Sequence, residues 1–206
     1  MTSTFADLGV PEDLIRVLAK QGIESPFAIQ TLTISDALKR RDVCGKAKPG
    51  SGKTLAFSLP AVAHTERNQQ GKPTTLMLTP TRELANQISG VVEPLADARS
   101  LRPIAVYGGT NNDKQIEKIT QGIDIIIATP GRLIDLIDRK AIDVALVERV
   151  VVDEADRMAD MGFLPQVEWI LRHIEVDHQT MLFSATLDGA VDTVVKRHLH
   201  LSLIHI

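Results

Sequence analysis

Residues 47–54 read Ala-Lys-Pro-Gly-Ser-Gly-Lys-Thr, and this stretch decides the fold. It lies between a short apolar run and a segment with a helical pattern. A glycine-rich turn in that position leaves backbone N–H groups free to point at phosphate oxygens, with the positive end of the helix dipole behind them. Lys53 would then reach the β and γ phosphates of a nucleoside triphosphate, and the Thr54 hydroxyl would hold Mg²⁺.

An acidic stretch far downstream supplies the groups that such a loop lacks. The apolar run at 149–152 ends in Asp-Glu-Ala-Asp, residues 153–156. Ligands bind at the carboxyl ends of strands in open α/β sheets, so this run would deliver a carboxylate to the phosphate loop. We therefore expect Asp153 to be the second magnesium anchor, and Glu154 to be the base that orients and deprotonates the attacking water.

Length and composition fit one ordinary α/β domain. The chain has 206 residues, of which 44% are hydrophobic, enough for a substantial core. Its formal net charge is −3, so no overall positive field attracts nucleic acid, and any such contact must come from a local patch. The single cysteine, Cys44, cannot form an internal disulfide, and no signal peptide or membrane span is recognisable, so we expect a cytoplasmic protein.

Helical and strand patterns alternate along the whole chain. Short apolar runs that we interpret as strands buried on both faces occur at 42–45, 74–79, 103–106, 124–128, 149–152 and 180–183. Helical patterns occur at 11–21, 29–38, 52–66, 83–96, 112–121, 132–139, 165–173 and 190–198. This alternation predicts an α/β fold with right-handed crossovers and a mostly parallel sheet flanked by helices on both faces.

Further motifs follow the phosphate loop in a fixed order. They are Pro-Thr-Arg-Glu-Leu-Ala at 80–85, Gly-Gly at 108–109, Thr-Pro-Gly-Arg at 129–132, Asp-Glu-Ala-Asp at 153–156 and Ser-Ala-Thr at 184–186. Together with the loop, this series closely resembles the first RecA-like domain of DEAD-box RNA helicases over residues 5–200, and an alanine such as Ala47 opens the loop in that family. The resemblance implies a RecA-like P-loop NTPase domain that uses ATP and Mg²⁺ and binds RNA.

Upstream of the loop, the segment that ends at Gln30 resembles the adenine-reading Q motif of the same family. The Gln30 amide carries both a donor and an acceptor, so it can pair with an adenine edge and reject guanine. The resemblance implies that the Phe5 ring stacks on the base. The chain departs from the family pattern at Ile23, at Phe27, which we interpret as a core side chain, and at Pro49, whose nitrogen cannot donate to a phosphate.

The resemblance implies two groups of residues on the nucleotide side. Those expected to hold ATP are Phe5, Gln30, Ala47, Lys48, Pro49, Gly50, Ser51, Gly52, Lys53 and Thr54, with Mg²⁺ on Thr54 and Asp153. Those expected to carry catalysis are Lys53, Asp153, Glu154, Asp156, Ser184 and Thr186. The hydroxyls of Ser184 and Thr186 can hydrogen-bond Asp156, a link that in the family couples nucleotide state to RNA engagement.

RNA contact is expected on a third group of residues, namely Thr81, Arg82, Gly109, Thr129, Gly131 and Arg132. Two helix starts, near Arg82 and Arg132, would present N–H groups, hydroxyls and guanidinium groups to phosphates without reading bases. Contacts to phosphate and 2′-OH would favour RNA over DNA by shape. A local patch of this kind could bind RNA even though the net charge of the chain is negative.

Each of these RNA motifs also has a purely structural interpretation. A threonine and an early acid, here Thr81 and Glu83, suit the first turn of a helix whatever its function. Residues 129–131 could be only a strand-to-helix turn, and the glycines at 108–109 only a loop. Taken alone, the segment at 80–85 favours the structural interpretation, whereas the order and completeness of the whole series favour the functional one.

We expect three parts along the chain. Residues 1–32 form the Q-motif region packed on the domain, residues 33–200 form the RecA-like ATP-binding domain, and residues 201–206 are a non-native tail that resembles translated sequencing-adapter DNA. The family's second RecA-like domain is absent, so the chain alone would hydrolyse ATP poorly, because the arginine fingers of that domain are worth about 10³ to 10⁵ in rate. We expect a monomer that needs this domain in cis and has no membrane contact.

The predicted function is an ATP-dependent RNA helicase, in which RNA-stimulated ATP hydrolysis drives local duplex unwinding. Two alternatives remain open, namely an ATP-gated RNA clamp that does not unwind RNA and a DNA translocase with the same phosphate loop. The acidic tetrad and Gln30 favour the RNA helicase over the translocase. The assignment depends on Lys53 and Asp153, remote in the chain, meeting around one magnesium-bound triphosphate.

Overall fold

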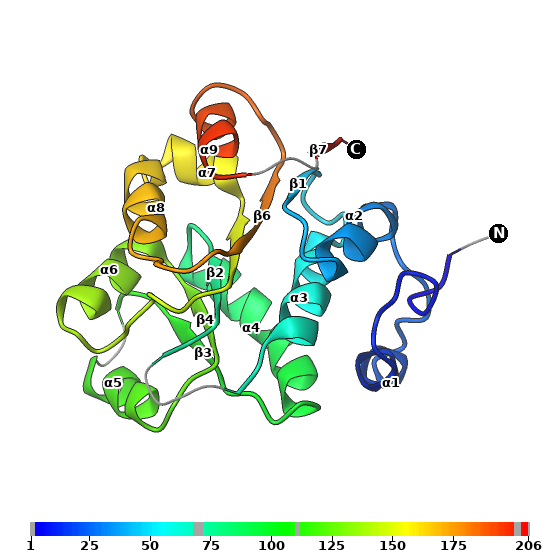
Figure 1. The fold of residues 1–206 in the computed structure, drawn as a ribbon, viewed down its shortest axis with the longest axis horizontal. Helices are drawn as coiled ribbons and strands as arrows, with labels where there is room; N and C mark the ends of the chain where they lie inside the picture. Colours follow the sequence, from blue (N-terminus) through cyan, green and yellow to red (C-terminus); the bar gives the residue numbers. More distant parts are fainter. Residues whose placement is uncertain (1–2, 68–71, 110–111, 200–202, 206) are drawn as a thin grey trace.

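The computed structural model describes residues 3–67, 72–109, 112–199 and 203–205, which form one parallel sheet between layers of helices (Figure 1). The strands are β1 (Val43–Lys46), β2 (Thr75–Leu78), β3 (Pro103–Val106), β4 (Ile125–Ala128), β5 (Arg149–Asp153), β6 (Gln179–Ser184) and β7 (Leu203–His205). The helices are α1 (Glu12–Lys20), α2 (Ala28–Leu38), α3 (Lys53–His64), α4 (Arg82–Asp97), α5 (Asn112–Thr120), α6 (Pro130–Asp138), α7 (Ala155–Asp160), α8 (Leu164–Leu171) and α9 (Ala190–His198).

The strands lie in the order β3-β4-β2-β5-β6-β1-β7, and all neighbours run parallel. All carboxyl ends therefore lie along one edge, from which the loops with the predicted site residues emerge. The register places Val152 of β5 opposite both Leu78 of β2 and Leu182 of β6. The acidic tetrad thus begins level with the ends of β2 and β6, at the centre of this edge.

Helices cover the strands from two sides, and the sequence of each strand reflects this. Every residue of β2, β4, β5 and β6 is buried, whereas β3, at one border of the sheet, alternates between buried and half-buried positions. Parallel sheets in α/β proteins are covered on both faces, so their central strands read as continuous apolar runs. The apolar runs in the sequence identify these strands for that reason.

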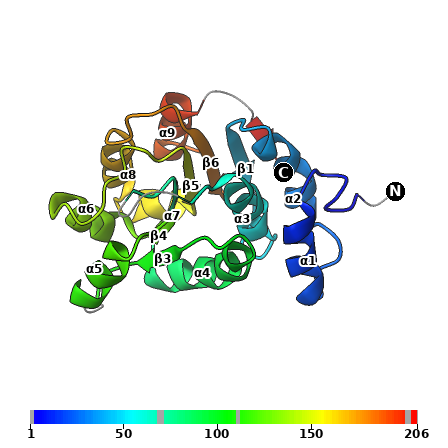
Figure 2. The same ribbon diagram turned by 60° about the horizontal axis from the view of Figure 1, so that its bottom comes forward.

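Two hydrophobic clusters form the core, one on each face of the sheet. The first joins α1–α4 to one set of strand side chains, and the second joins α5–α9 to the other set. Side chains of a strand alternate between faces, so Val151 lies in the first cluster while Val150 and Val152 lie in the second. Figures 1 and 2 show α1–α4 on one side of the sheet and α6–α9 on the other.

All the strands and helices expected from the sequence are present, with ends that differ by no more than two residues. The sequence prediction misses two elements. Helix α7 follows β5 directly and has 6 residues, too few to show a helical period. Strand β7 lies within residues 201–206, which we expect to be a non-native tail, and pairs in parallel with β1.

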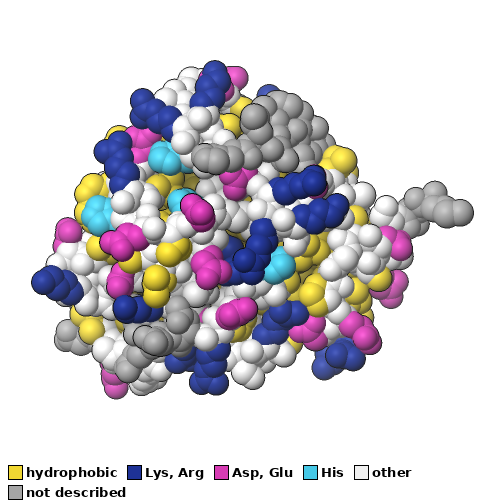
Figure 3. Space-filling model, viewed as in Figure 1, with side chains coloured by type: hydrophobic (Ala, Val, Ile, Leu, Met, Phe, Trp, Pro, Cys, Tyr) yellow, Lys and Arg dark blue, Asp and Glu magenta, His cyan; other side chains and the backbone are white. Residues whose placement is uncertain are grey.

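The surface carries charged side chains of both signs, as expected from the numbers of acidic and basic residues in the sequence. On the face shown in Figure 3, Lys and Arg side chains are interspersed with Asp and Glu. Within the ranges that the structure describes, no helix is both long and apolar enough to cross a bilayer. Any contact with a polyanion would therefore involve local groups of side chains and backbone N–H groups rather than a uniform charged face.

Candidate nucleotide and RNA site

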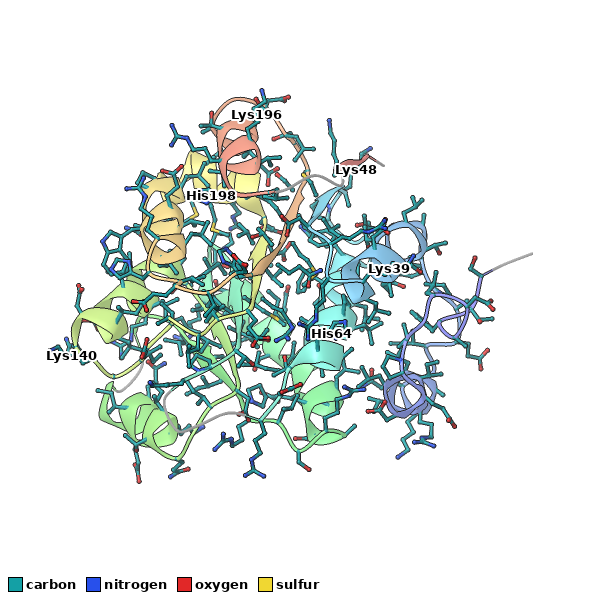
Figure 4. The ribbon with its side chains drawn as sticks, in the orientation of Figure 1. Lys39, Lys48, His64, Lys140, Lys196 and His198 are labelled. Carbon is teal, nitrogen blue, oxygen red and sulfur yellow. The ribbon has the colours of Figure 1, made fainter. Side chains whose placement is uncertain are left out.

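The loop after β1 has the backbone of a phosphate-binding turn. It starts with a hydrogen bond from the Ala47 amide to the Ser184 carbonyl of 2.9 Å, which fixes the loop to the end of β6. Gly50 and Gly52 have φ angles of +79° and +85°, in the region that favours glycine. Helix α3 then begins at Lys53, so its free N–H groups face the loop. In Figure 4, Lys48 marks this loop, beyond the end of β1 and away from His64 at the end of α3.

Gly52 is also hemmed in by two side chains from the start of α2. A Cβ atom on Gly52 would lie 2.4 Å from Cδ2 of Phe27 and 2.7 Å from Nε2 of Gln30. The Gln30 amide donates a hydrogen bond of 2.8 Å to the Gly52 carbonyl and accepts one of 2.8 Å from the Phe27 amide. The residue predicted to read adenine therefore lies directly against the phosphate loop.

Lys53 and Asp153 meet across the sheet edge. Their Nζ and Oδ1 atoms are 3.2 Å apart, and both side chains are buried. Glu154 lies beside them, with its Oε1 atom 3.6 Å from the same Nζ. The spatial condition set by the sequence, that the lysine of the loop and the acidic tetrad share one site, is thus fulfilled.

The Asp153 carboxylate has the properties of a cation ligand. Its Oδ1 atom is buried, and its contact with Lys53 falls outside hydrogen-bond angles, so this oxygen has no hydrogen-bond donor among the described residues. Burial raises the pKa of Asp153, the positive charge of Lys53 opposes this rise, and the charge of Glu154 adds to it. A bound divalent cation would give this oxygen a second partner beside Lys53 and offset the cost of burying its charge.

The oxygen ligands at the phosphate loop suit Mg²⁺ that is bound together with a nucleotide. They do not suit a metal ion that is bound by protein side chains alone. In the part of the chain that the structure describes, no group of three or more His, Cys, Asp or Glu side chains is arranged so that it could hold a metal ion. Mg²⁺ usually keeps several waters and takes one or two protein oxygens together with substrate phosphates. The predicted pair, Thr54 and Asp153, matches that mode of binding.

Glu154 has a strained backbone at the start of α7. Its φ and ψ angles are 53° and 51°, the left-handed region that a non-glycine residue enters at a cost of about 1–3 kcal/mol. Strain of this kind is kept where the surrounding structure requires one side-chain direction. Here the conformation sends the carboxylate back toward Lys53, while its other oxygen lies 3.4 Å from Arg157 Nη1.

The predicted link between the acidic tetrad and the end of β6 exists through Ser184, whereas the predicted contact of Thr186 is not made among the described residues. The Asp156 carboxylate accepts a hydrogen bond of 3.2 Å from the Ala185 backbone amide, and the Asp156 amide donates one of 3.1 Å to Ser184 Oγ. Among the described residues, no hydrogen bond joins Thr186 to Asp156, and Thr186 is exposed. Each of the two hydrogen bonds joins a side chain of one segment to a backbone amide of the other, so the Ala185 amide makes the contact that we expected from the Thr186 hydroxyl.

The structure gives the burial of the two phenylalanines singled out in the sequence, Phe5 and Phe27. Phe27, interpreted from the sequence as a core side chain, is 60% exposed, so that interpretation is wrong. Phe5, predicted to stack on the base, is 2% exposed and packs in the first core cluster, so its ring would have to leave the core to do so. Phe27 precedes α2 as its N-cap residue, and its ring lies against the phosphate loop at Gly52.

The residues predicted to bind RNA follow the strands at the other end of the same edge. Thr81 follows β2, Gly109 follows β3, and Thr129 follows β4, whereas the phosphate loop, the acidic tetrad and the Ser-Ala-Thr segment follow β1, β5 and β6. In the sheet these two sets form two adjacent groups, β3-β4-β2 and β5-β6-β1. The nucleotide and RNA residues, interleaved in the sequence, are thus separated in space along one edge.

The two arginines predicted to contact RNA differ in exposure. Arg82 is exposed, and its Cζ atom lies 5.2 Å from the centre of the Tyr107 ring. The Arg132 side chain is only 8% exposed and forms an ion pair with Asp135. Its Nε and Nη2 atoms both donate to Oε1 of Gln115, at 3.1 Å and 3.0 Å. The sequence prediction missed Gln115 and Tyr107, because neither belongs to a motif that carries chemistry by itself.

Comparison with known proteins gives a consistent result. A family model described as DEAD/DEAH box helicase matches residues 27–194. DEAD-box ATP-dependent RNA helicase 24 of Oryza sativa subsp. japonica is 44% identical over 197 residues, which are 94% of this chain and 26% of the relative. RNA helicase CrhR of Synechocystis is 42% identical over 200 residues, 97% of this chain and 40% of the relative. The chain therefore spans less than half the length of these relatives.

Solved structures resemble the chain over nearly its full length. A DEAD box protein from the hyperthermophile Methanococcus jannaschii has a TM-score of 0.92 at 31% identity, covering 100% of this chain and 56% of that chain. A hypothetical ATP-dependent RNA helicase from Sulfolobus tokodaii has a TM-score of 0.86 at 33% identity, covering 95% of this chain and 57% of that one. The sheet and its flanking helices thus match one part of each of these larger chains.

Proposed function

The chain belongs to the DEAD/DEAH box helicase family, and on this premise we propose that it is the ATP-binding part of an RNA helicase that couples ATP hydrolysis to local separation of RNA duplexes. One observation carries this proposal, the contact of Lys53 with Asp153 and Glu154 at the phosphate loop. Those three side chains supply the cation, the metal ligand and the base that phosphoryl transfer to water requires.

The residues have separate roles in the proposed reaction. Lys53 binds phosphate oxygens and stabilises the charge that grows on them, and free N–H groups of the loop bind the same oxygens. Glu154 orients a water molecule and accepts its proton. Thr54 and Asp153 hold Mg²⁺, which when bound neutralises charge on the phosphates. Asp156, held by the Ala185 amide, connects this site to the end of β6.

The RNA part of the proposal rests on the helix starts of α4 and α6 and on the Gly108–Gly109 turn. Thr81 and Thr129 precede these helices as N-cap residues, so both lie at helix starts where backbone N–H groups without an intrahelical partner are directed outward. Such groups bind phosphates without regard to sequence. The exposed guanidinium of Arg82 adds a charged contact.

Several finer features belong to the same proposal. We propose ATP as the nucleotide, selected through the Q-motif glutamine Gln30, and a requirement for a second domain in cis. We also propose that the protein acts as a monomer in the cytoplasm, where its free and buried Cys44 stays reduced. Analytical ultracentrifugation and localisation of the tagged full-length protein test these last two points.

The proposed nucleotide site is tested by calorimetric titration of the chain with ADP and Mg²⁺. We expect Lys53→Ala to weaken binding about 10- to 100-fold, because it removes charge-assisted hydrogen bonds. Lys39→Ala is the matched control, since Lys39 lies at the opposite end of α2 from the loop. Glu154→Gln should keep nucleotide affinity within about twofold, because the base acts in the reaction rather than in binding.

The activity itself is tested with the full-length protein. RNA should stimulate its ATP hydrolysis, DNA should not, and Glu154→Gln should abolish both turnover and strand separation. Equal affinity of the Lys53→Ala and wild-type chains for ADP would rule out the nucleotide site. Tight RNA retention with a nonhydrolysable ATP analogue, but no strand separation, would replace the helicase by a clamp, and equal stimulation by DNA would favour a translocase.

A further inference from the structure

Gln115 on α5 connects two of the segments predicted to bind RNA. Its side chain is 8% exposed, and Oε1 accepts two hydrogen bonds from the Arg132 guanidinium, of 3.1 Å and 3.0 Å. Its Nε2 atom donates a long hydrogen bond of 3.5 Å to the Tyr107 carbonyl. A side-chain amide donates from its nitrogen and accepts at its oxygen, so Gln115 can satisfy both neighbours.

The third segment joins this network through the ring of Tyr107. The guanidinium of Arg82 lies over that ring, 5.2 Å from its centre, at a distance typical of a cation–π contact. Tyr107 is also the residue directly before Gly108 and Gly109. One connected set of contacts therefore runs from α6 through α5 and the end of β3 to the first residue of α4.

Arg132 is placed to hold this network rather than to grip a phosphate. Its side chain is 8% exposed, and three of its five N–H groups are directed at protein oxygens of Gln115 and Asp135. Moving the guanidinium to a phosphate would leave Gln115 Oε1 buried without a donor, and buried unpaired acceptors are costly. The free backbone N–H groups at the start of α6 remain available to RNA.

We propose that Gln115 is a positioning residue that holds three RNA-facing segments, at Arg82, Gly108–Gly109 and Thr129–Arg132, in one fixed arrangement, and that Arg132 acts on RNA through this network. This inference rests on the proposed RNA binding. A glycine pair has the largest backbone freedom of any dipeptide, so anchoring the carbonyl before it limits the conformations that RNA binding would otherwise have to restrict. Preorganisation of this kind raises affinity without a new contact to the ligand.

Two substitutions of Gln115 distinguish its contact with Arg132 from its contact with the Tyr107 carbonyl. Gln115→Leu removes both, whereas Gln115→Glu keeps an oxygen for Arg132 but cannot donate to the Tyr107 carbonyl. Gln121→Leu is the matched control, because Gln121 is an exposed glutamine that lies just after α5. Each variant is compared with the wild-type chain by ¹⁵N relaxation of the backbone amides, by fluorescence anisotropy with single-stranded RNA, and by calorimetry with ADP.

We expect Gln115→Leu to lower the ¹⁵N order parameters of the amides both at residues 108–109 and at residues 131–133, and to weaken RNA binding by at least about fivefold. Gln115→Glu should lower the order parameters at residues 108–109 alone. Gln121→Leu should match the wild type in every measurement, and ADP affinity should stay within about twofold in all variants. A merely structural role for Gln115 would instead lower global stability without this local pattern.

The outcomes keep the inference distinct from the proposed function. Unchanged ¹⁵N order parameters at both segments in Gln115→Leu overturn the inference, whatever the RNA measurement shows. Unchanged RNA affinity in Gln115→Leu, with a wild-type chain that does bind RNA, overturns it as well. A wild-type chain that binds no RNA contradicts the proposed function, and the positioning role on RNA is then lost with it.

Discussion

Gly52 shows how much one residue of the phosphate loop has to satisfy. Its φ of +85° favours glycine, and a Cβ atom there would meet the Phe27 ring and the Gln30 amide. The first requirement comes from the backbone and the second from the start of another helix, α2. The glycines of the loop thus allow its backbone conformation, and the packing of the start of α2 against the loop stabilises that conformation.

We predict that Gly52→Ala lowers the free energy of unfolding by about 2 kcal/mol or more, since it combines left-handed backbone strain with overpacking against Phe27. Phe27→Ala alone should cost little, because the ring is mostly exposed. The double variant should recover about 1 kcal/mol of the loss, which is the overpacking part. Urea unfolding of all three variants measures this coupling.

Gly90→Ala is the control for the comparison of Gly52→Ala, Phe27→Ala and the double variant. Gly90 lies in α4, and a Cβ atom there would meet nothing within 4 Å. Gly90→Ala should therefore stabilise the chain by about 0.5–1 kcal/mol. Strict additivity of Gly52→Ala and Phe27→Ala would show that the ring does not restrict the loop.

At the scale of elements, α4 and α6 begin in similar ways but use their threonines differently. Thr81 caps α4, since its hydroxyl accepts a hydrogen bond of 3.3 Å from the Leu84 amide. Thr129 occupies the same position before α6 and makes no side-chain cap hydrogen bond. The structural interpretation thus accounts for the Thr81 hydroxyl, whereas the Thr129 hydroxyl is left for another partner.

We predict that Thr81→Ala lowers the free energy of unfolding by about 1 kcal/mol, the usual cost of a lost N-cap, and that Thr129→Ala changes it by less than about 0.5 kcal/mol. If the Thr129 hydroxyl binds phosphate, Thr129→Ala should weaken RNA binding severalfold at unchanged stability. Thermal unfolding and RNA anisotropy on the same two variants make the comparison. Equal destabilisation by both substitutions would contradict this assignment of the caps.

At the scale of the whole molecule, two half-buried histidines connect stability to pH. Burial lowers the pKa of His64 below its ordinary value of 6.5. The hydrogen bond to the Leu38 carbonyl opposes this shift, whereas the positive charges of Arg149, Arg40 and Arg99 add to it. Burial likewise lowers the pKa of His198, against the opposing charge of Glu168, and the nearby groups His178, Arg172 and Arg197 lower it further. The folded state therefore favours both imidazoles in their neutral form.

We predict that the free energy of unfolding decreases as the pH falls below about 6.5. In this range the two histidines bind protons more readily in the unfolded chain than in the folded one, which favours unfolding. Their contribution is fully present above that pH and is lost as the pH falls toward the lowered folded values. The raised pKa of Asp153 acts in the opposite direction above pH 3.8, since its folded form takes up protons more readily. The histidine part is therefore measured as a difference between proteins.

Urea unfolding at pH 7.5 and pH 5.5 of the wild type and of a His64→Gln/His198→Gln variant isolates this contribution, at roughly the two sides of the ordinary histidine pKa. The variant should lose less stability between the two pH values than the wild type does. An equal loss in both proteins would show that other groups control acid sensitivity in this range. Asp13 and Asp135, whose pKa values are lowered by arginine partners and hydrogen bonds, add their effect only at still lower pH.

Most of the fold could be predicted from local pattern, and most of the errors involve contacts between remote residues. Runs such as the one at 149–152 are apolar because both faces are covered, and that signal is present in the sequence itself. Helix α7 was missed because it is too short to show a period. The exposure of Phe27, the burial of Phe5 and the partner of Arg132 depend on how α1, α2 and α5 pack, and single positions carry no such signal.

The sequence by itself determined the class of fold, the phosphate loop at 47–54 and the acidic tetrad at 153–156, because turn chemistry and hydrophobic periodicity are local properties. Only the tertiary structure decided that Lys53 lies 3.2 Å from Asp153, that a backbone amide holds Asp156, and that Gln115 binds Arg132. The reason is the strand order β3-β4-β2-β5-β6-β1, which differs from the order along the chain. Crossover connections set that order, so residues far apart in sequence become neighbours at one edge of the sheet.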